Sequence, residues 1–211
     1  MRAICLEGPS AAGKSSLSRA LVTVIGAAAV PEVRQLFSRP VDSESDWYLQ
    51  RQQERWEIAC RSAPEGALAI LDGDILQPLW YGWAYGFSNY HSFSELVAFY
   101  RPLIASASLA FPDKYFVLES SVEELRVRKA SDATRTRRNF EHHLELIEPQ
   151  RKYFQALEAL EPALVHWLPS TTVPRNMETI QRLLASTEAR IISNDLEIFD
   201  ELLQFLERRA C

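Results

Sequence analysis

The chain of 211 residues carries 28 acidic and 23 basic side chains, a net charge of −5, and 47% of it is hydrophobic. This composition is that of an ordinary globular domain, so it excludes disordered, collagen-like and disulfide-stapled classes. A dedicated nucleic-acid binder would be strongly basic, and a membrane helix needs about 20 consecutive apolar residues, which the chain lacks. Its 3 cysteines are scattered, which suits a reducing compartment. We expect a single cytoplasmic domain over residues 1–211, with no nucleic-acid or membrane partner.

Short apolar runs alternate with longer amphipathic runs along the chain, which is typical of a parallel sheet covered by helices. Five runs are expected to be buried strands, at 3–6, 27–30, 67–71, 115–118 and 165–168. Helices are expected at about 14–24, 47–63, 94–108, 122–129, 139–160, 176–185 and 195–209. We therefore predict an α/β P-loop fold of three layers, in which a five-stranded parallel sheet is flanked by helices.

Two of these helices raise further expectations. Pro102 lies inside the helix at 94–108 and should kink it. The helix at 195–209 carries an apolar stripe, formed by Leu196, Phe199, Leu202, Leu203 and Leu206. We expect this stripe to dock on the domain in preference to joining two chains, although a homodimer stays open.

Residues 8–15 read Gly-Pro-Ser-Ala-Ala-Gly-Lys-Ser and fit the pattern G-x-x-x-x-G-K-[ST] without a mismatch. An expected strand precedes them and an expected helix follows, as a phosphate-binding loop requires. In such a loop backbone N–H groups point at phosphate oxygens, and the helix N-terminus adds partial positive charge. We expect Lys14 to reach the β- and γ-phosphates of ATP and the Ser15 hydroxyl to bind Mg²⁺. The residues assigned to the nucleotide are Gly8, Ser10, Ala11, Ala12, Gly13, Lys14, Ser15 and Ser16.

Carboxylates follow two of the expected strands. Asp72 comes directly after the run at 67–71, where phosphate-loop proteins carry an acidic residue that helps to hold Mg²⁺. Asp74 follows, and two carboxylates at one strand end can divide metal binding from proton acceptance. Glu32 follows the second expected strand, at the sheet edge where open α/β folds bind ligands. We assign Asp72 to the metal and Asp74 or Glu32 to the deprotonation of an acceptor hydroxyl. A turn at 72–74 and a simple helix start at Glu32 are the structural alternatives.

Basic residues gather between positions 126 and 138. They are Arg126, Arg128, Lys129, Arg135, Arg137 and Arg138. Phosphoryl transfer depends on positioning and on stabilising negative charge, for which planar guanidinium groups are suited. We therefore expect residues 130–138 to form a lid over the nucleotide. Arg126 and Arg128 are assigned to the nucleotide and Arg135 to the transferred phosphoryl group. A solvated basic face or an RNA-binding patch would have the same composition.

The acceptor side is expected in the segment 76–111, whose first part is crowded with aromatic residues. Because they follow the proposed carboxylates, four of them are assigned to walls that stack on a planar or apolar acceptor: Trp80, Tyr81, Trp83 and Tyr85. The alternative is a subdomain that simply buries its aromatic side chains. Arg34 and Arg101 could bind a phosphate of the acceptor or pair with surface acids.

With these residues laid out, the chain resembles the P-loop kinases of the nucleoside and nucleotide kinase group, deoxynucleoside kinases and thymidylate kinase above all. The resemblance covers about residues 3–185 and rests on the phosphate loop, Glu32, the acidic end of the third strand and the run at 115–125. Deoxynucleoside kinases carry a catalytic Glu after their second strand, which implies that role for Glu32. The arginine that these families carry beside the third-strand acid is absent from Leu-Asp-Gly-Asp at 71–74. The phosphate loop also resembles that of chloramphenicol phosphotransferase, and Asp-Gly-Asp resembles a run in adenylylsulfate kinase.

The residues and the resemblance together predict a kinase that uses ATP and Mg²⁺ to phosphorylate a small-molecule acceptor, above all a nucleoside or nucleotide. An antibiotic or secondary-metabolite O-phosphotransferase with the same machinery is one alternative. A nucleotide-switched ATPase or regulator, which passes no phosphoryl group to an acceptor, is an alternative of another class. The Asn-Lys-x-Asp pattern that reads guanine in GTPases is absent from the sequence.

Overall fold

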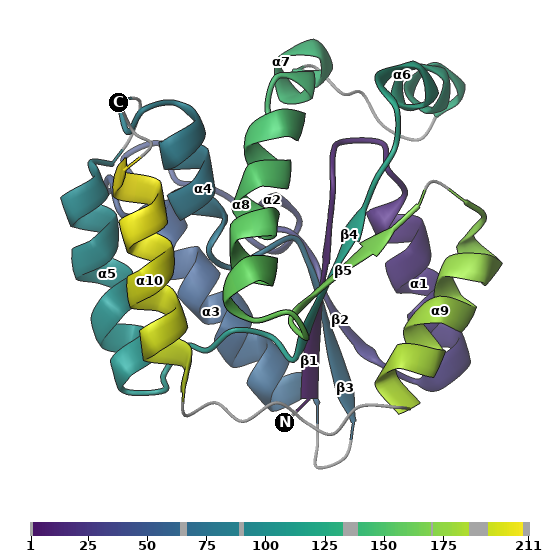
Figure 1. The fold of residues 1–211 in the computed structure, drawn as a ribbon, viewed down its shortest axis with the longest axis horizontal. Coiled ribbons are helices and arrows are strands. Elements are labelled where there is room, and N and C mark those ends of the chain that lie inside the picture. The colour runs from purple at the N-terminus through teal and green to yellow at the C-terminus, as the bar shows by residue number, and fades with distance from the viewer. Residues whose placement is uncertain are drawn as a thin grey trace.

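A parallel sheet of five strands, in the order β2-β3-β1-β4-β5, forms the centre of the domain (Figure 1). This computed structural model describes residues 2–63, 67–88, 91–132, 139–169, 171–185 and 194–208. The strands are β1 (Arg2–Glu7), β2 (Ala28–Val30), β3 (Leu68–Asp72), β4 (Lys114–Leu118) and β5 (Val165–Leu168). All five strands predicted from the sequence are confirmed, as is the α/β fold.

Helices cover both faces of this sheet. They are α1 (Lys14–Ile25), α2 (Val33–Leu36), α3 (Trp47–Ser62), α4 (Gln77–Ala84), α5 (Phe93–Ala105), α6 (Val122–Ser131), α7 (Phe140–Leu144), α8 (Ile147–Leu160), α9 (Val173–Ala185) and α10 (Asp195–Arg208). Figure 1 shows α1 and α9 together on one face and α3, α5, α8 and α10 on the other. The domain therefore has the three predicted layers.

Alternation along the central strand explains why both faces are covered. Ile4 and Leu6 of β1 belong to the apolar core under α1 and α9, whereas Ala3 and Cys5 belong to the larger core on the opposite face. Successive side chains of a strand point to opposite sides, so a strand that is apolar throughout must be buried on both.

The predicted helix at 139–160 is two helices, α7 and α8, which are joined at Glu145 and Leu146. Phe140 packs in the core on the α1 side of the sheet, whereas Tyr153 and Phe154 pack in the core on the α3 side. Pro149 in the first turn of α8 has no N–H to donate to the Glu145 carbonyl, which accounts for a break at this place. The N-cap of α5 is Ser92 rather than Ser94, because Ser92 forms a capping box with Glu95, and the helix continues through Pro102.

Helix α10 docks on the domain, as predicted from its apolar stripe. It lies against α5 and α8, and it buries Ile198, Phe199, Leu202, Leu203 and Leu206. At its start the Asp195 carboxylate accepts a hydrogen bond of 2.8 Å from the Phe111 backbone N–H. Among the residues that the structure describes, no helix is long and apolar enough to cross a membrane.

Candidate active site

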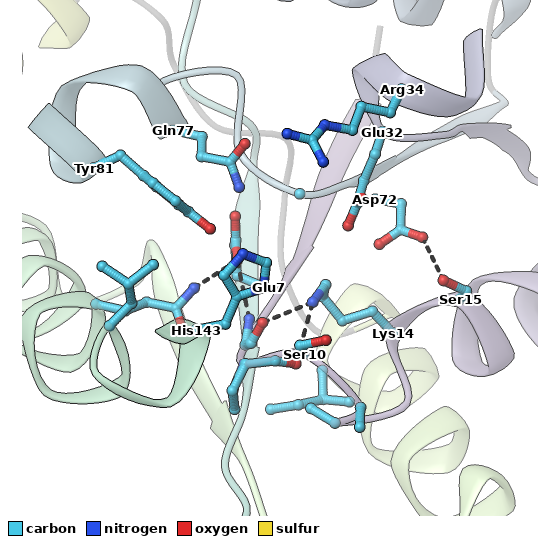
Figure 2. Close-up of a pocket in the computed structure, with 18 of the residues that line it drawn as sticks. Glu7, Ser10, Lys14, Ser15, Glu32, Arg34, Asp72, Gln77, Tyr81 and His143 are labelled. Carbon is cyan, nitrogen blue, oxygen red and sulfur yellow. Dashed lines mark hydrogen bonds between the residues drawn. The ribbon is translucent and has the colours of Figure 1, made fainter. Parts of the chain in front are cut away.

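A cavity of about 1140 Å³ opens at the carboxyl ends of the strands. The phosphate loop lines one part of it, and side chains from α2, α3, α4 and α7 line the rest. In Figure 2, Glu32, Asp72 and Ser15 lie on one side of this cavity and Gln77 and Tyr81 on the other. The parallel sheet thus brings strand ends that are distant in sequence to one edge, as expected for a ligand site in an open α/β fold.

The phosphate loop connects β1 to α1 in a conformation that depends on glycine. Gly8 has a φ of +133°, and a Cβ atom there would lie 2.5 Å from the Leu118 carbonyl oxygen on β4. Gly13 is the left-handed N-cap of α1, with φ of +106°. The Lys14 ammonium donates to the Gly8 carbonyl at 2.7 Å. The eight residues between Gly8 and Ser16 that were assigned to the nucleotide from the sequence all line the cavity.

Ser15 and Asp72 form a pair of oxygen donors beside this loop. The Ser15 hydroxyl donates a hydrogen bond of 2.8 Å to Asp72 Oδ2. Asp72 Oδ1 is buried and has no hydrogen-bond partner among the described residues. Hydroxyl and carboxylate oxygens are the hard donors that Mg²⁺ prefers, and Mg²⁺ usually takes few protein ligands and completes its shell with phosphate oxygens and water. The two residues therefore fit the metal role predicted for them.

Glu32 lies directly after β2, at the start of α2, and its side chain lines the cavity. Its Cγ lies 3.9 Å from the position that a Cβ would take on Gly73, so Glu32 flanks the turn that follows Asp72. No hydrogen bond to the Glu32 carboxylate occurs within the described part of the chain. The carboxylate is therefore available to a ligand in the cavity.

Asp74, the other predicted proton acceptor, does not line the cavity. Its side chain is 1% exposed, and its Oδ1 accepts hydrogen bonds from the Tyr115 hydroxyl at 2.9 Å and the Leu76 N–H at 3.1 Å. Burial and, to a smaller extent, the nearby charge of Glu7 raise the pKa of Asp74 to about 7. The carboxyl group thus belongs to the core beneath the site.

Glu7, which sequence reasoning did not select, lies at the floor of the cavity. It is 2% exposed and accepts hydrogen bonds from the N–H groups of Gly8 at 3.0 Å and Asp74 at 2.6 Å. Gln150 Nε2 of α8 donates a third, at 2.8 Å. Burial raises the pKa of Glu7, and the Lys14 charge opposes that shift. The signal in the sequence was an acidic residue at the end of an otherwise apolar strand.

Among the described residues of the basic segment, the structure brings one arginine to the phosphate loop. Arg128 Nη1 donates to the Ala12 carbonyl at 3.0 Å and lines the cavity. Arg126 instead forms an exposed ion pair of 3.0 Å with Glu141 and does not line the cavity. Residues 133–138 of the predicted lid, Arg135 among them, lie outside the described residues.

The predicted acceptor residues divide into two groups. Trp80, Tyr81, Tyr85 and Arg34 line the cavity. Trp83 packs on Phe205 of α10 at a ring distance of 5.8 Å, and Arg101 forms two hydrogen bonds with Asp200, at 2.9 and 2.8 Å. Tyr81 and Trp83 are two positions apart on α4, so the helical period turns their side chains to nearly opposite sides of the helix.

Three polar side chains that sequence reasoning missed complete this wall. The Tyr48 hydroxyl of α3 donates a hydrogen bond of 2.8 Å to Gln77 Oε1 of α4, and His143 of α7 also lines the cavity. Burial lowers the pKa of His143, and the neighbouring His142 and Arg34 lower it further. A neutral imidazole can both donate and accept hydrogen bonds. The wall therefore combines aromatic surface with uncharged polar groups.

Two kinases are among the solved structures that match the fold. No family model matches the chain, and no curated protein matches it. The thymidylate kinase of Candida albicans matches with a TM-score of 0.60 and 14% identity, over 88% of this chain and 91% of that one. The deoxyadenosine kinase of M. mycoides with bound dATP matches with a TM-score of 0.56 and 16% identity, over 88% and 100%.

The chain has the fold of the P-loop nucleoside and nucleotide kinases. The sequence lacks the arginine that these kinases carry beside the acidic residue of the third strand, and another arginine lies at this place in the structure. No arginine follows Asp72 directly, but the guanidinium group of Arg55 reaches the same strand end from α3 and donates to the Asp72 carbonyl at 2.8 Å.

Proposed function

We propose that the protein is a kinase that transfers the γ-phosphoryl group of Mg²⁺-bound ATP to a hydroxyl or phosphate group of a small molecule. A nucleoside or nucleotide is the acceptor class that we favour. The observation that carries the proposal is that one cavity holds both the phosphate loop and a separate aromatic and polar wall. The likeness to thymidylate and deoxyadenosine kinases supports it.

The donor half of the proposed reaction rests on the phosphate loop. Its backbone N–H groups and the N-terminus of α1 would bind the β- and γ-phosphates, with Lys14 as the compact positive charge. Ser15 and Asp72 would hold Mg²⁺, which neutralises charge on the phosphates when it is bound. Arg128 lies at the same loop and would contact the nucleotide.

The acceptor half rests on Glu32. In the proposed step, an acceptor oxygen bonds to the γ-phosphorus while the bond from that phosphorus to the bridging oxygen of ATP breaks, and ADP leaves. The hydroxyl proton passes to the Glu32 carboxylate, which lines the cavity and has no other hydrogen bond among the described residues. Asp74 cannot take this proton from a ligand in the cavity, because its carboxyl group is buried beneath the site.

The acceptor wall supports a kinase over a nucleotide-switched ATPase. An ATPase needs only a water molecule at the γ-phosphate, whereas this cavity continues to Tyr48, Gln77 and Tyr81. Gln77 and Tyr81 could read polar edges and stack on a planar ring. This favours a ring-bearing acceptor, and it leaves an aromatic antibiotic as the second candidate class.

The test is phosphoryl transfer from ATP by the purified protein, with nucleosides, nucleoside monophosphates and aromatic antibiotics as separate acceptor groups. We expect ADP release to depend on acceptors of the first two groups. Transfer confined to the antibiotics would establish the second candidate. ATP hydrolysis at one rate with every acceptor would contradict the kinase proposal.

A further inference from the structure

Arg55 of α3 is a charged side chain buried between two strand ends of the site. It is 1% exposed. Its Nε donates to the Pro31 carbonyl at 2.9 Å, and its Nη2 donates to the Asp72 and Gly73 carbonyls at 2.8 and 2.9 Å. Its Nη1 donates to Gln52 Oε1 of the same helix at 2.6 Å. One guanidinium group therefore joins the backbone just after β2 to the backbone just after β3.

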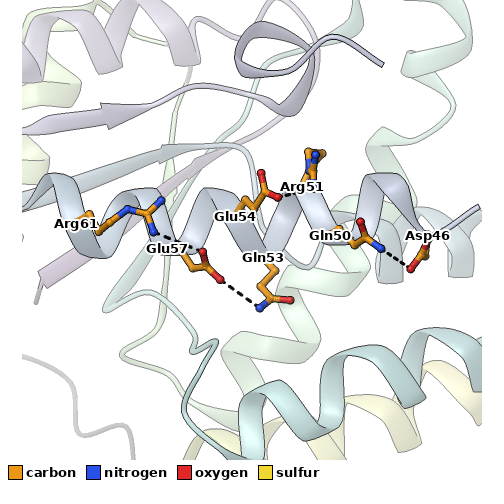
Figure 3. Close-up of polar contacts among 7 residues, drawn as sticks. All are labelled: Asp46, Gln50, Arg51, Gln53, Glu54, Glu57 and Arg61. Atoms are coloured by element: carbon orange, nitrogen blue, oxygen red, sulfur yellow. Dashed lines mark hydrogen bonds and ion pairs between the residues drawn. The ribbon is translucent and has the colours of Figure 1, made fainter. Parts of the chain in front are cut away.

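The other arginines of α3 show how unusual this environment is. Arg51 pairs with Glu54, and the exposed Arg61 pairs with Glu57 at 3.5 Å (Figure 3). Within the described residues no carboxylate lies within ion-pair distance of Arg55. A buried guanidinium without a carboxylate partner is costly unless hydrogen bonds satisfy it. The backbone carbonyl oxygens of Pro31, Asp72 and Gly73 accept these hydrogen bonds from Arg55.

These carbonyls belong to the residues that carry the chemistry. In the ladder between β2 and β3 the last pair is Val30 and Leu71, so this ladder ends just before Pro31 and Asp72, although Asp72 still pairs with Leu6 of β1. Pro31 precedes Glu32, the proposed proton acceptor, and Asp72 is the proposed metal ligand. Beyond the ladder, Arg55 is a direct cross-link between the two backbones.

We propose that Arg55 is a positioning residue that sets the spacing between the Glu32 carboxylate and the Asp72 carboxylate. The inference rests on the proposed function, because it concerns the alignment of the acceptor hydroxyl with the metal-bound phosphate. Arginine suits this task because its N–H groups are fixed in one plane, so a single side chain holds both strand ends at a set distance. A lysine at the same position keeps the charge but has a single nitrogen for acceptors that lie apart.

The test compares Arg55→Lys with Arg61→Lys, a matched change on the exposed side of the same helix. For each we would measure kcat, the nucleotide Kd with and without Mg²⁺, and thermal unfolding. We expect kcat of Arg55→Lys to fall by about 10²-fold, since misplacement of about 1 Å has effects of that size. Mg²⁺ should also tighten nucleotide binding less than in the wild type. The metal-free nucleotide Kd should stay unchanged, because the phosphate loop is intact.

A purely structural role would give a different pattern. If Arg55→Lys is less stable but retains wild-type kcat and the wild-type effect of Mg²⁺ on nucleotide binding below its Tm, the proposal is overturned. If Arg55→Lys does not fold, Gln52→Met decides, because it releases Nη1 and keeps the guanidinium. A several-fold lower kcat with an unchanged metal-free Kd would support positioning, and unchanged kcat would overturn it.

Failure of the proposed function would look different again. A wild-type protein that binds Mg·ATP but phosphorylates no acceptor would contradict the kinase proposal. The effect of Mg²⁺ on nucleotide binding would still separate Arg55→Lys from Arg61→Lys if Arg55 positions Asp72. Equal effects of Mg²⁺ in both variants would then overturn the inference.

Discussion

The phosphate-loop side and the acceptor side of the cavity differ in how the chain builds them. The phosphate-loop side comes from one run, residues 8–15, between β1 and α1. The acceptor side brings together Tyr48, Gln77 and His143 from α3, α4 and α7, which meet only in the folded domain. A contiguous loop fixes the type of chemistry, whereas the wall built by tertiary packing decides which molecule is used. Variants on the two sides should therefore fail in different ways.

The largest loss should come from the phosphate-loop side. Lys14→Ala removes the charge nearest the transferred phosphoryl group and should lower kcat for phosphoryl transfer by about 10³-fold. Lys152→Ala is the control, since Lys152 forms an exposed ion pair of 3.7 Å with Glu148, and it should retain wild-type kcat. Steady-state transfer assays measure both. Wild-type turnover by Lys14→Ala would contradict the proposed role of the phosphate loop in phosphoryl transfer.

Glu32→Gln should lower kcat by about 10²-fold, as expected for loss of a general base. The nucleotide Kd should not change, because Glu32 lies beyond the phosphate loop. Titration calorimetry and transfer assays on the same preparation separate the two quantities. If Asp74→Asn instead shows the 10²-fold loss and Glu32→Gln does not, the proton passes to the buried carboxyl group after all.

Two aromatic residues of α4 test the acceptor side. Tyr81→Phe removes a hydroxyl from the cavity wall and should raise the acceptor KM by about tenfold, the effect of one lost hydrogen bond. Trp83→Phe changes a ring that packs on Phe205 and should lower Tm without altering that KM. If both variants raise the acceptor KM equally, the assignment of Tyr81 to the acceptor and of Trp83 to packing is contradicted.

The smallest effect on activity is expected from Asp74→Asn, whose signature is stability. The ordinary Asp pKa of 3.8 is raised to about 7 in the folded protein, so the unfolded chain loses this proton at lower pH than the folded domain. Stability from this group is therefore full below pH 4 and declines as pH rises to about 7. Asparagine keeps an oxygen that can accept from Tyr115 and Leu76. Its Tm should exceed that of the wild type at pH 8 and match it near pH 4, by calorimetry at both pH values.

The sequence predicted those parts of the molecule that neighbouring residues decide. The five strands and the phosphate loop follow from apolar runs and from Gly8, Gly13 and Lys14 in their local pattern. Asp72 also lines the site as expected, because the end of a strand in a parallel sheet has a known position.

The remaining positions depend on packing between distant elements. Arg101 is held by Asp200, which requires α10 to lie against α5. Trp83 leaves the cavity because α4 turns it toward α10. Arg55 lies seventeen residues before Asp72 in the chain, and only the packing of α3 on the sheet brings them together. Hydrophobic periodicity identifies the helix that carries such a side chain, but it does not identify the residue that the side chain contacts in the folded domain.

The docking of α10 has a consequence for the order in which the domain can form. Its 14 residues are synthesised after all five strands, yet they cover apolar surface on α5 and α8 and supply the buried carboxylate that holds the Phe111 N–H. The phosphate loop and α1 are translated earlier and pack in the opposite, smaller core. Because synthesis proceeds from the N-terminus, the nascent domain exposes the α5–α8 surface until residue 208 has left the ribosome. This surface is where chaperone binding and early aggregation should be sought.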